Sequence, residues 1–263
     1  MRINVAPCVA ALAALAGVAG AQTDWYNTDR GRPLRTEDAV VLERHAFEFQ
    51  MTPIAAHRAG MRTTWEAEPE LAWGFARRTQ MAVGVPLLSE RTRGSSSPIA
   101  AAGVHLTITH ALNAETLGVP AIGLSATAIV PAGGRSGERA AGEVAALFTR
   151  TSAHARAHLN VRARVGSEDA GADIARWTAG LAADRPIALR SVLLAAEVTA
   201  EEPDTNLNVV WRFGAGVRVQ LSPRVVLDAG IGRTATGAER GWSMTAGSAV
   251  AFAIPALQMR GVR

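Results

Sequence analysis

The chain has 263 residues, and its 27 basic and 23 acidic side chains leave a formal net charge of only +4. This length suits one all-β domain. All the basic residues are arginines, and they are dispersed among acidic residues rather than clustered beside stacking aromatics, which excludes a nucleic-acid-binding protein. The single cysteine, Cys8, lies in the N-terminal apolar run, which excludes a small domain held together by disulfides.

The first predicted element is a secretory signal peptide over residues 1–21. Met1 and Arg2 form a short basic start, residues 5–18 are apolar, and residues 19–21 form a small-residue cleavage pattern. The apolar run is too short for a good membrane span, and no later stretch offers the ~18 uninterrupted apolar residues of a transmembrane helix. We therefore expect an exported protein that enters a membrane only as a β-barrel.

Residues 22–37 are polar and irregular, and we expect a periplasmic leader that could fold into the mouth of a barrel. Residues 38–263 are predicted to form the barrel itself, because apolar and polar residues alternate there in repeated stretches that end in turns. Side chains on a strand alternate between its two faces, so each stretch has one apolar and one polar face. The twelve predicted strands cover residues 43–53, 61–76, 79–88, 98–110, 119–130, 140–150, 153–165, 174–183, 188–200, 206–221, 224–233 and 241–254.

A soluble β-sandwich would also alternate, with its apolar faces packed in a core. Here the other face is too charged to pack in a second core, and the apolar face consists mainly of Ala, Val and Leu without the large aromatic residues that fill sandwiches. We therefore predict an all-β fold, an antiparallel transmembrane β-barrel of about 12 strands, in the outer membrane of a Gram-negative-type bacterium. An even number of strands places the beginning and the end of the barrel-forming chain on the same side of the membrane, the periplasmic side.

The predicted links support this orientation, because outer-membrane barrels combine short periplasmic turns with longer external loops. Short turns are expected near residues 76–78, 151–153, 185–187 and 222–223, a slightly longer one at 112–118, and long polar loops at 89–97, 131–139, 166–173, 201–205 and 234–240. Five tryptophans share the apolar parity and lie near strand ends, where they would form the aromatic girdles of a membrane barrel: Trp65, Trp73, Trp177, Trp211 and Trp242.

Several stretches resemble a known family. They are RPLRTEDAVVLERHAFEFQ (residues 32–50), EPELAWGFARRTQMAVGVPL (68–87), IVPAGG (129–134), RSVLLAAEV (190–198) and GAGVRVQLSPRVVLDAGIGR (214–233). They are similar to the meta-pathway phenol-degradation family of outer-membrane proteins, whose members are often described simply as transporters. The resemblance covers most of the mature chain in order. It implies an outer-membrane barrel that passes small solutes, including aromatic or hydrophobic ones, and it implies no catalytic residues.

Three glutamates on one predicted strand form the first candidate site. Glu66, Glu68 and Glu70 point the same way and lie about 6–7 Å apart in succession. Such carboxylates could bind calcium or serve acid–base catalysis, but nothing distinguishes an acid from a base here. We favour a charge ladder in the barrel lumen, paired with arginines of neighbouring strands because unpaired like charges in a narrow interior are costly. Solute selection is the next interpretation.

A second candidate is a positive strip on the predicted strand 153–165, formed by His154, Arg156, His158, Arg162 and Arg164. Residues four apart on a strand are roughly 13 Å apart, so His154 and His158 alone cannot share a metal ion. The strip is either a hydrated wall, which we favour, or a surface that attracts anionic solutes.

The remaining inward candidates for the lumen are Arg62, His105, Glu197, Arg212 and Arg218. Together these residues predict a channel in which small solutes diffuse passively through a polar lumen, with the loop at residues 89–97 contributing to selectivity. The alternative is a closed, structural or adhesive barrel whose lumen is plugged by paired charges or by the leader. An enzyme is not predicted, nor is a cofactor or a metal; the expected partners are outer-membrane lipid and a small-molecule solute.

Overall fold

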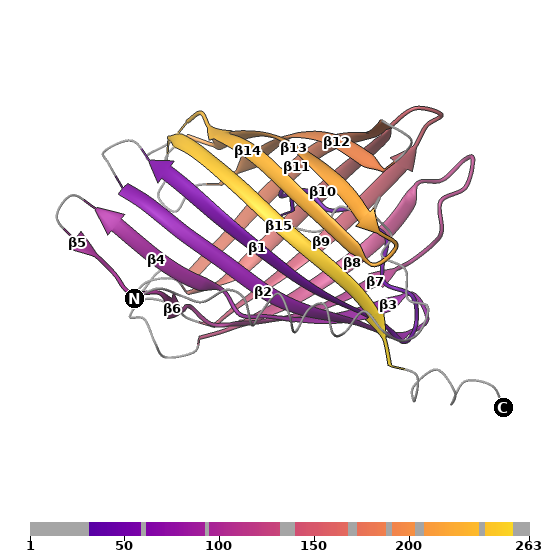
Figure 1. Cartoon of the computed structure of the whole chain (residues 1–263), viewed down its shortest axis with the longest axis horizontal. Helices are drawn as coiled ribbons and strands as arrows, with labels where there is room; N and C mark the ends of the chain where they lie inside the picture. The colour runs from indigo at the N-terminus through magenta and orange to yellow at the C-terminus, as the bar shows by residue number, and fades with distance from the viewer. Residues whose placement is uncertain are drawn as a thin grey trace.

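The computed structural model describes residues 32–58, 62–92, 95–131, 140–167, 173–187, 191–202, 208–236 and 240–254. They form one antiparallel sheet in which the first strand, β1 (Ala46–Arg58), pairs with both β2 (Arg62–Ala76) and the last strand, β15 (Gly241–Ala253), so that the sheet closes into a barrel (Figure 1). The predicted signal peptide lies outside the described residues. Within them, no helix is long and apolar enough to cross a membrane.

The other strands follow the chain around the barrel. They are β3 (Thr79–Gly84), β4 (Leu87–Thr92), β5 (Ser95–Ser96), β6 (Ala100–Ala101), β7 (Val104–Ala111), β8 (Ala121–Val130), β9 (Ala141–Thr151), β10 (Arg156–Ser167), β11 (Asp173–Ile187), β12 (Val192–Glu201), β13 (Val210–Ser222) and β14 (Val225–Thr234). β3 and β4 both pair with β2 and share one position in the ring, and β5, β6 and β7 share the next, so the barrel has twelve positions. This confirms the predicted fold.

The division between β3 and β4 has a cause in the sequence. Pro69 lies inside β2, and Val85 and Pro86 lie opposite it between the two shorter strands. The Val85 amide donates to the Pro69 carbonyl, but neither proline has an amide hydrogen to continue the pairing. The wall therefore contains an irregularity at the position where a proline within a strand is tolerated.

Two of the predicted links are wrong. Residues 185–187 belong to β11, in which Pro186 lies opposite Leu193. The predicted loop 89–97 is largely a hairpin, because β4 continues to Thr92 and pairs with β5. In Figure 1 this hairpin extends beyond the rest of the wall at one end of the barrel. We call this the loop end, and the opposite end, where β1 begins and β15 finishes, the turn end.

The apolar parity of the strands points away from the barrel axis, as predicted. On β10, for example, Leu159, Val161 and Val165 are exposed, whereas His158, Asn160 and Arg162 are buried. The same alternation places Leu181, Leu194 and Leu227 outside on β11, β12 and β14. All the strands in the described residues belong to one closed sheet, and no second sheet among them covers these side chains. The sandwich interpretation is therefore wrong, and the exposed band requires a hydrocarbon environment.

Aromatic side chains mark both borders of this band. Near the loop end, four tryptophans are exposed on the outer face: Trp65, Trp177, Trp211 and Trp242. Near the turn end, Trp73 stacks on Phe47, with ring centroids 5.8 Å apart, and Phe47 stacks on Phe252. Amphipathic aromatic rings favour the membrane–water interface, so the two groups are placed as the girdles of a membrane-spanning barrel.

We expect an arginine on the middle of the apolar band to destabilise the barrel strongly. Val161 is the sixth residue of the twelve in β10 and is 47% exposed. Because arginine at the bilayer midplane costs about 2–4 kcal/mol, Val161→Arg should lower the free energy of unfolding in lipid vesicles by that amount. Leu117→Arg, in a 98% exposed position of the turn between β7 and β8, is the matched control and should have little effect. Equal effects of both variants would contradict the membrane position of the band.

Candidate functional site

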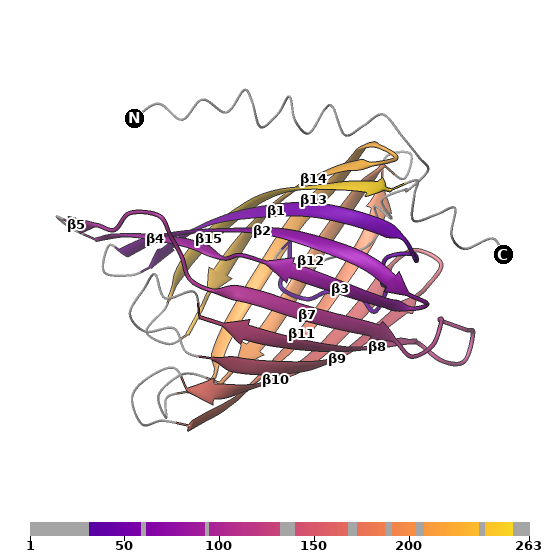
Figure 2. The same ribbon diagram turned by 90° about the horizontal axis from the view of Figure 1, so that it is seen from below.

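The chain enters the first strand from inside the barrel. Residues 32–42, which we call the inner belt, follow the inner wall from β14 past β12 and β10 to β3 (Figure 2). The Leu42 amide donates to Gln80 at 2.8 Å, and the His45 amide then donates to the carbonyl of Gly74, close to the start of β1. The belt thus continues past the predicted leader boundary at residue 37, and it narrows the lumen from the wall inward.

Main-chain amides of the inner belt are bound by wall side chains. The amides of Arg35 and Thr36 donate to the carboxylate of Glu197 at 2.9–3.0 Å. Further along, the Glu37 amide donates to Asn160 at 2.8 Å, and the Ala39 amide donates to Thr149 Oγ1 at 2.9 Å. Residues 33–42 form no strand, so these wall side chains satisfy backbone amides that a neighbouring strand would otherwise bind.

The charges of the inner belt are opposite to those of the wall beneath it. Arg32, fully buried, lies 3.4 Å from Asp228 and 3.6 Å from Glu48. Beyond the middle of the belt the signs reverse, and Asp38 lies 3.5 Å from Arg156. Because buried charges are tolerated only when they are paired, this order of signs holds the belt in one register.

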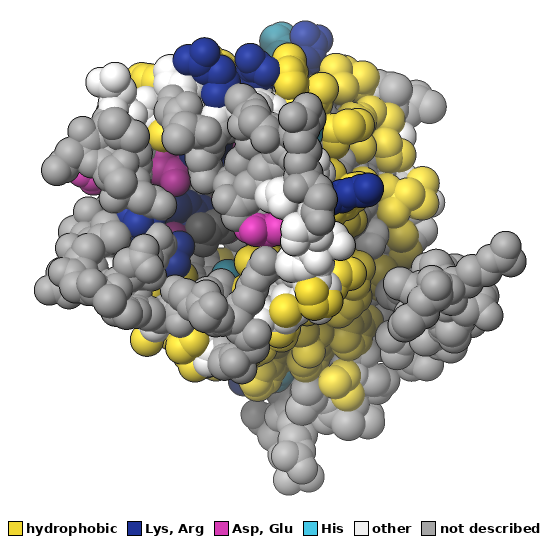
Figure 3. All heavy atoms as spheres, turned by 90° about the vertical axis from the view of Figure 1, so that its left-hand side faces the viewer, with side chains coloured by type: hydrophobic (Ala, Val, Ile, Leu, Met, Phe, Trp, Pro, Cys, Tyr) yellow, Lys and Arg dark blue, Asp and Glu magenta, His cyan; other side chains and the backbone are white. Residues whose placement is uncertain are grey.

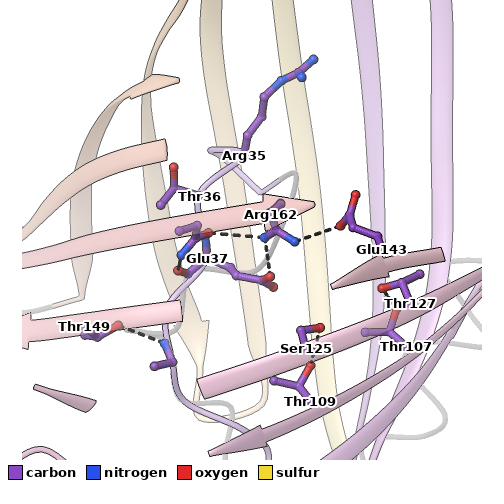
Figure 4. Close-up of polar contacts among 12 residues, drawn as sticks. Arg35, Thr36, Glu37, Thr107, Thr109, Ser125, Thr127, Glu143, Thr149 and Arg162 are labelled. Carbon is purple, nitrogen blue, oxygen red and sulfur yellow. Dashed lines mark hydrogen bonds and ion pairs between the residues drawn. The ribbon is translucent and has the colours of Figure 1, made fainter. Parts of the chain in front are cut away.

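Arg162 is the centre of the best-connected part of this interface (Figure 4). Its guanidinium binds the carboxylate of Glu37 in the inner belt and lies 3.2 Å from Glu143 on β9. Arg35, by contrast, points away from this group into the lumen, where its side chain is 60% exposed. The belt therefore has an anchored face toward β10 and one arginine, Arg35, that projects into the lumen, where it lies 3.8 Å from Glu201.

Glycines allow the inner belt to approach the wall. A Cβ atom added at Gly216 on β13 would lie 2.5 Å from the Cβ atom of Pro33, and one at Gly230 on β14 would lie 2.8 Å from the Pro33 carbonyl oxygen. Both distances are shorter than any real contact of that kind, so neither position accepts a larger residue while Pro33 stays in place. Apolar contacts complete the interface, with Leu34 packed against Ala182 and Ala195.

Beside the belt, the lumen contains a main cavity of about 410 Å³. One wall carries the glutamates of β2, namely Glu66, Glu68 and Glu70, and the facing wall carries arginines of β10 and β11, namely Arg162, Arg164 and Arg176. Hydroxyl side chains of β7 and β8 lie between them, joined in the pairs Thr107–Thr127 and Thr109–Ser125 (Figure 4). Seen from the loop end, acidic and basic side chains are visible inside a hollow (Figure 3).

A second cavity of about 130 Å³ lies against β13, β14 and β15. Arg35 and Glu66 line both cavities, so the projecting arginine of the inner belt stands between them. Arg212 lines the smaller cavity and is paired with Glu201. A solute moving along the lumen would therefore pass Arg35.

Most of the predicted lumen residues face the interior. Glu68 binds His105, with 2.7 Å between the carboxylate and Nδ1, and Glu70 accepts a hydrogen bond from Gln50. We expected an arginine to pair with Glu68, but its partner here is His105. Six others lie at the belt, the cavities or the buried wall: Arg156, His158, Arg162, Arg164, Glu197 and Arg212. Arg218 is buried opposite Asp228 in the register of β13 and β14.

Two predicted residues need separate comment. His154 was expected on the inward face of a strand, but β10 begins only at Arg156 and His154 is exposed in the preceding turn, so it is not a lumen residue. The reason is local, since Ser152 closes this turn by bonding the amide and carbonyl of Ala155. Arg62 begins β2, and its side chain lies outside the described part of the structure.

Several important residues escaped prediction. Glu143, Arg176 and Asp228 lie on the inward parity of predicted strands, and that signal could have identified them. Glu37 and Asp38 could not be found this way, because the inner belt has no alternation to place its side chains. Among the described residues, no group of three or more His, Cys, Asp or Glu side chains is placed to hold a metal ion.

Comparisons with known proteins agree with this architecture. No family model matches the chain, and no curated protein matches it. Among solved structures, the COG4313 outer membrane channel from Pseudomonas putida F1 superposes with a TM-score of 0.62 at 14% identity, covering 86% of this chain and 100% of that one. The NanC porin gives 0.57 at 7% identity, covering 76% and 98%, and the KdgM porin gives 0.55 at 9%, covering 78% and 99%. At such identities the likeness establishes the fold, a twelve-stranded outer-membrane-type barrel.

Proposed function

We propose that this protein is an outer-membrane channel through which small solutes diffuse passively. The observation that carries the proposal is the contrast between the two faces of the barrel: the outer face is apolar, whereas the interior keeps a charged cavity of about 410 Å³ instead of a packed apolar core. A barrel that serves only as a scaffold needs no such space. The barrels with the same fold described above include a channel and two porins, which supports the same function here.

The solute class follows from the lining. The family resemblance implies aromatic or hydrophobic solutes. The described residues around the main cavity include no Phe, Tyr or Trp, and most are charged, hydroxyl-bearing or amide-bearing. A charged lumen concentrates ions of opposite sign and orients polar molecules, so we favour small polar solutes.

Planar-bilayer recording tests the proposal. Purified protein should give discrete conductance steps, and Arg35→Ala should enlarge each step and shift the selectivity toward cations, because it removes a positive side chain that stands between the two cavities. Arg185→Ala is the matched control, since Arg185 is exposed on β11 and lines neither cavity.

A silent bilayer would overturn the channel if the same preparation migrates as a folded barrel before boiling and as an unfolded chain after it. The remaining candidate would then be the closed barrel, with the inner belt as its plug. That alternative rests on a specific observation, the paired charges that fix the belt against β10 and β14.

A further inference from the structure

Basic side chains gather on the outside of the barrel at the turn end of β2, β3 and β7, three strands that lie side by side (Figure 2). Arg77 and Arg78 form the link between β2 and β3, and both are exposed. Beside them, Thr79 lies directly opposite the exposed His110 of β7, and its hydroxyl is 2.9 Å from Nδ1 of that histidine. We call Arg77, Arg78 and His110 the cationic corner. It lies at the border of the apolar band.

Hydrogen bonds hold the cationic corner in place. The Thr79 hydroxyl donates to the carbonyl of Arg77 at 3.1 Å. Because a hydroxyl has only one hydrogen, His110 must donate to Thr79 from Nδ1, which fixes the orientation of the imidazole. One guanidinium nitrogen of Arg78 donates to the Leu112 carbonyl at 3.4 Å, which uses one of five N–H groups. The corner is thus ordered, and Arg78 keeps further donors for a ligand.

The backbone of Arg78 shows that the turn alone does not account for an arginine. Its φ angle is 58°, in the left-handed region that is costly for most residues and that glycine and asparagine adopt more readily. A glycine or an asparagine would therefore suit this link better. A residue that persists in such a conformation points to a function of its side chain.

From the cationic corner toward the middle of the barrel, the outer face is apolar. In the register of the three strands, one row is formed by Trp73, Met81 and Ile108, and the next by Leu71, Val83 and Leu106. Successive rows on one face are about 6–7 Å apart. In the described parts of β2, β3 and β7, no outward position carries an acidic side chain. Cations at the end of an apolar lane match a molecule with an anionic head and hydrocarbon chains.

We propose that the cationic corner binds the headgroup of one anionic phospholipid, such as phosphatidylglycerol, whose acyl chains lie along the apolar lane. Guanidinium groups bind phosphate bidentately, and arginines near an anionic leaflet are attracted to it. A choline headgroup gains less, because the same cations repel its quaternary ammonium group. The site lies on the outside of the barrel, so it does not depend on whether the lumen conducts.

Native mass spectrometry of the detergent-solubilised full-length mature protein tests the site. The protein is mixed with equal amounts of phosphatidylglycerol and phosphatidylcholine that carry the same acyl chains, and the two species with one bound lipid are compared. We expect at least about fivefold more bound phosphatidylglycerol than phosphatidylcholine. Glycerol 3-phosphate at the same concentration should not displace the lipid, because it has the charge of the headgroup without the apolar chains.

Three variants make the result specific to the cationic corner. Arg77→Gln and Arg78→Asn should each lower the lipid ratio about fivefold. Arg240→Gln removes the same charge from an exposed position directly before β15, at the loop end, and should leave the ratio unchanged. Arg78→Asn should also keep or raise the denaturant midpoint in phosphatidylcholine vesicles, since asparagine tolerates a φ of 58° better than arginine does.

Equal retention of the two lipids would overturn the proposal. Equal losses in Arg77→Gln, Arg78→Asn and Arg240→Gln would also overturn it, because the preference would then come from general attraction between charges. Displacement by glycerol 3-phosphate would mean that the corner binds free phosphate esters rather than a lipid. A lower denaturant midpoint for Arg78→Asn would show that the turn itself needs the arginine, and an unchanged ratio in Arg77→Gln would then overturn the site.

Discussion

Deleting residues 25–41 should raise the single-channel conductance severalfold. This deletion removes most of the inner belt but keeps three residues after the predicted cleavage point, and it leaves β1 and the turn before it unchanged. The physical reason is that the belt occupies the wall from β14 to β3 and projects Arg35 between the two cavities. Without it, these cavities become one wider, water-filled path. Unchanged conductance would show that the narrowest part of the lumen lies elsewhere.

Whether the inner belt is a fixed constriction or a movable plug can be decided by a disulfide. A Cβ atom added at Gly123 on β8 would lie 3.6 Å from the Cβ atom of Ala39, which is within the range for a disulfide. The only natural cysteine lies in the predicted signal peptide, so Ala39→Cys with Gly123→Cys gives a single defined bridge.

We expect the oxidised and reduced forms of this double variant to conduct equally. Ion pairs hold the belt at its start, Arg32 with Asp228, and at its middle, Glu37 with Arg162, and opening it would leave four charges to find new partners. If oxidation abolishes the current and reduction restores it, the belt must move during permeation, and the fixed constriction is wrong.

The wall of the barrel was predictable because its environment is uniform. On every strand one parity meets lipid and the other meets the lumen, so alternation alone gives both the strand and the direction of its side chains. The strand predictions were wrong where the residue composition is typical of a loop or turn but the backbone pairs with a neighbouring strand. Ser95 and Ser96 resemble a loop but pair with β4. Pro186 resembles a turn but is the next-to-last residue of β11, where one missing amide is tolerated.

The inner belt was not predictable in the same way. Its residues contact positions far away in the sequence, as Arg32 does with Asp228, 196 residues further on. Such contacts depend on closure of the barrel, which no local pattern encodes. The family resemblance includes residues 32–50, but it did not predict that the inner belt lies in the lumen against the barrel wall. Charges of the main cavity were partly found, because Glu66, Glu68 and Arg164 lie on the polar parity of strands.

The second large effect concerns stability and depends on one buried carboxylate. Asp184 on β11 is 2% exposed, and its two oxygens accept hydrogen bonds from Arg156 at 3.0 and 2.8 Å and contact His158 Nε2 at 2.9 Å. Arg156 also lies 3.5 Å from Asp38 of the inner belt. Asp184 thus compensates the positive charge of Arg156, which lies where β10, β11 and the inner belt meet.

Asp184→Asn should lower the free energy of unfolding by about 3–5 kcal/mol, because it removes one partner of a buried ion pair and leaves the guanidinium insufficiently compensated. The measurement is the denaturant midpoint of the barrel in vesicles, followed by the gel shift between folded and unfolded forms. Glu115→Gln is the matched control: it breaks a partly exposed pair with Arg150, 3.6 Å away, and should cost less than about 1 kcal/mol. Combining Asp184→Asn with Arg156→Gln should restore part of the lost free energy of unfolding, because the double variant no longer buries an insufficiently compensated guanidinium. Strictly additive losses would mean that Asp184 and Arg156 are not coupled, and that this ion pair does not stabilise the contact between β10 and β11.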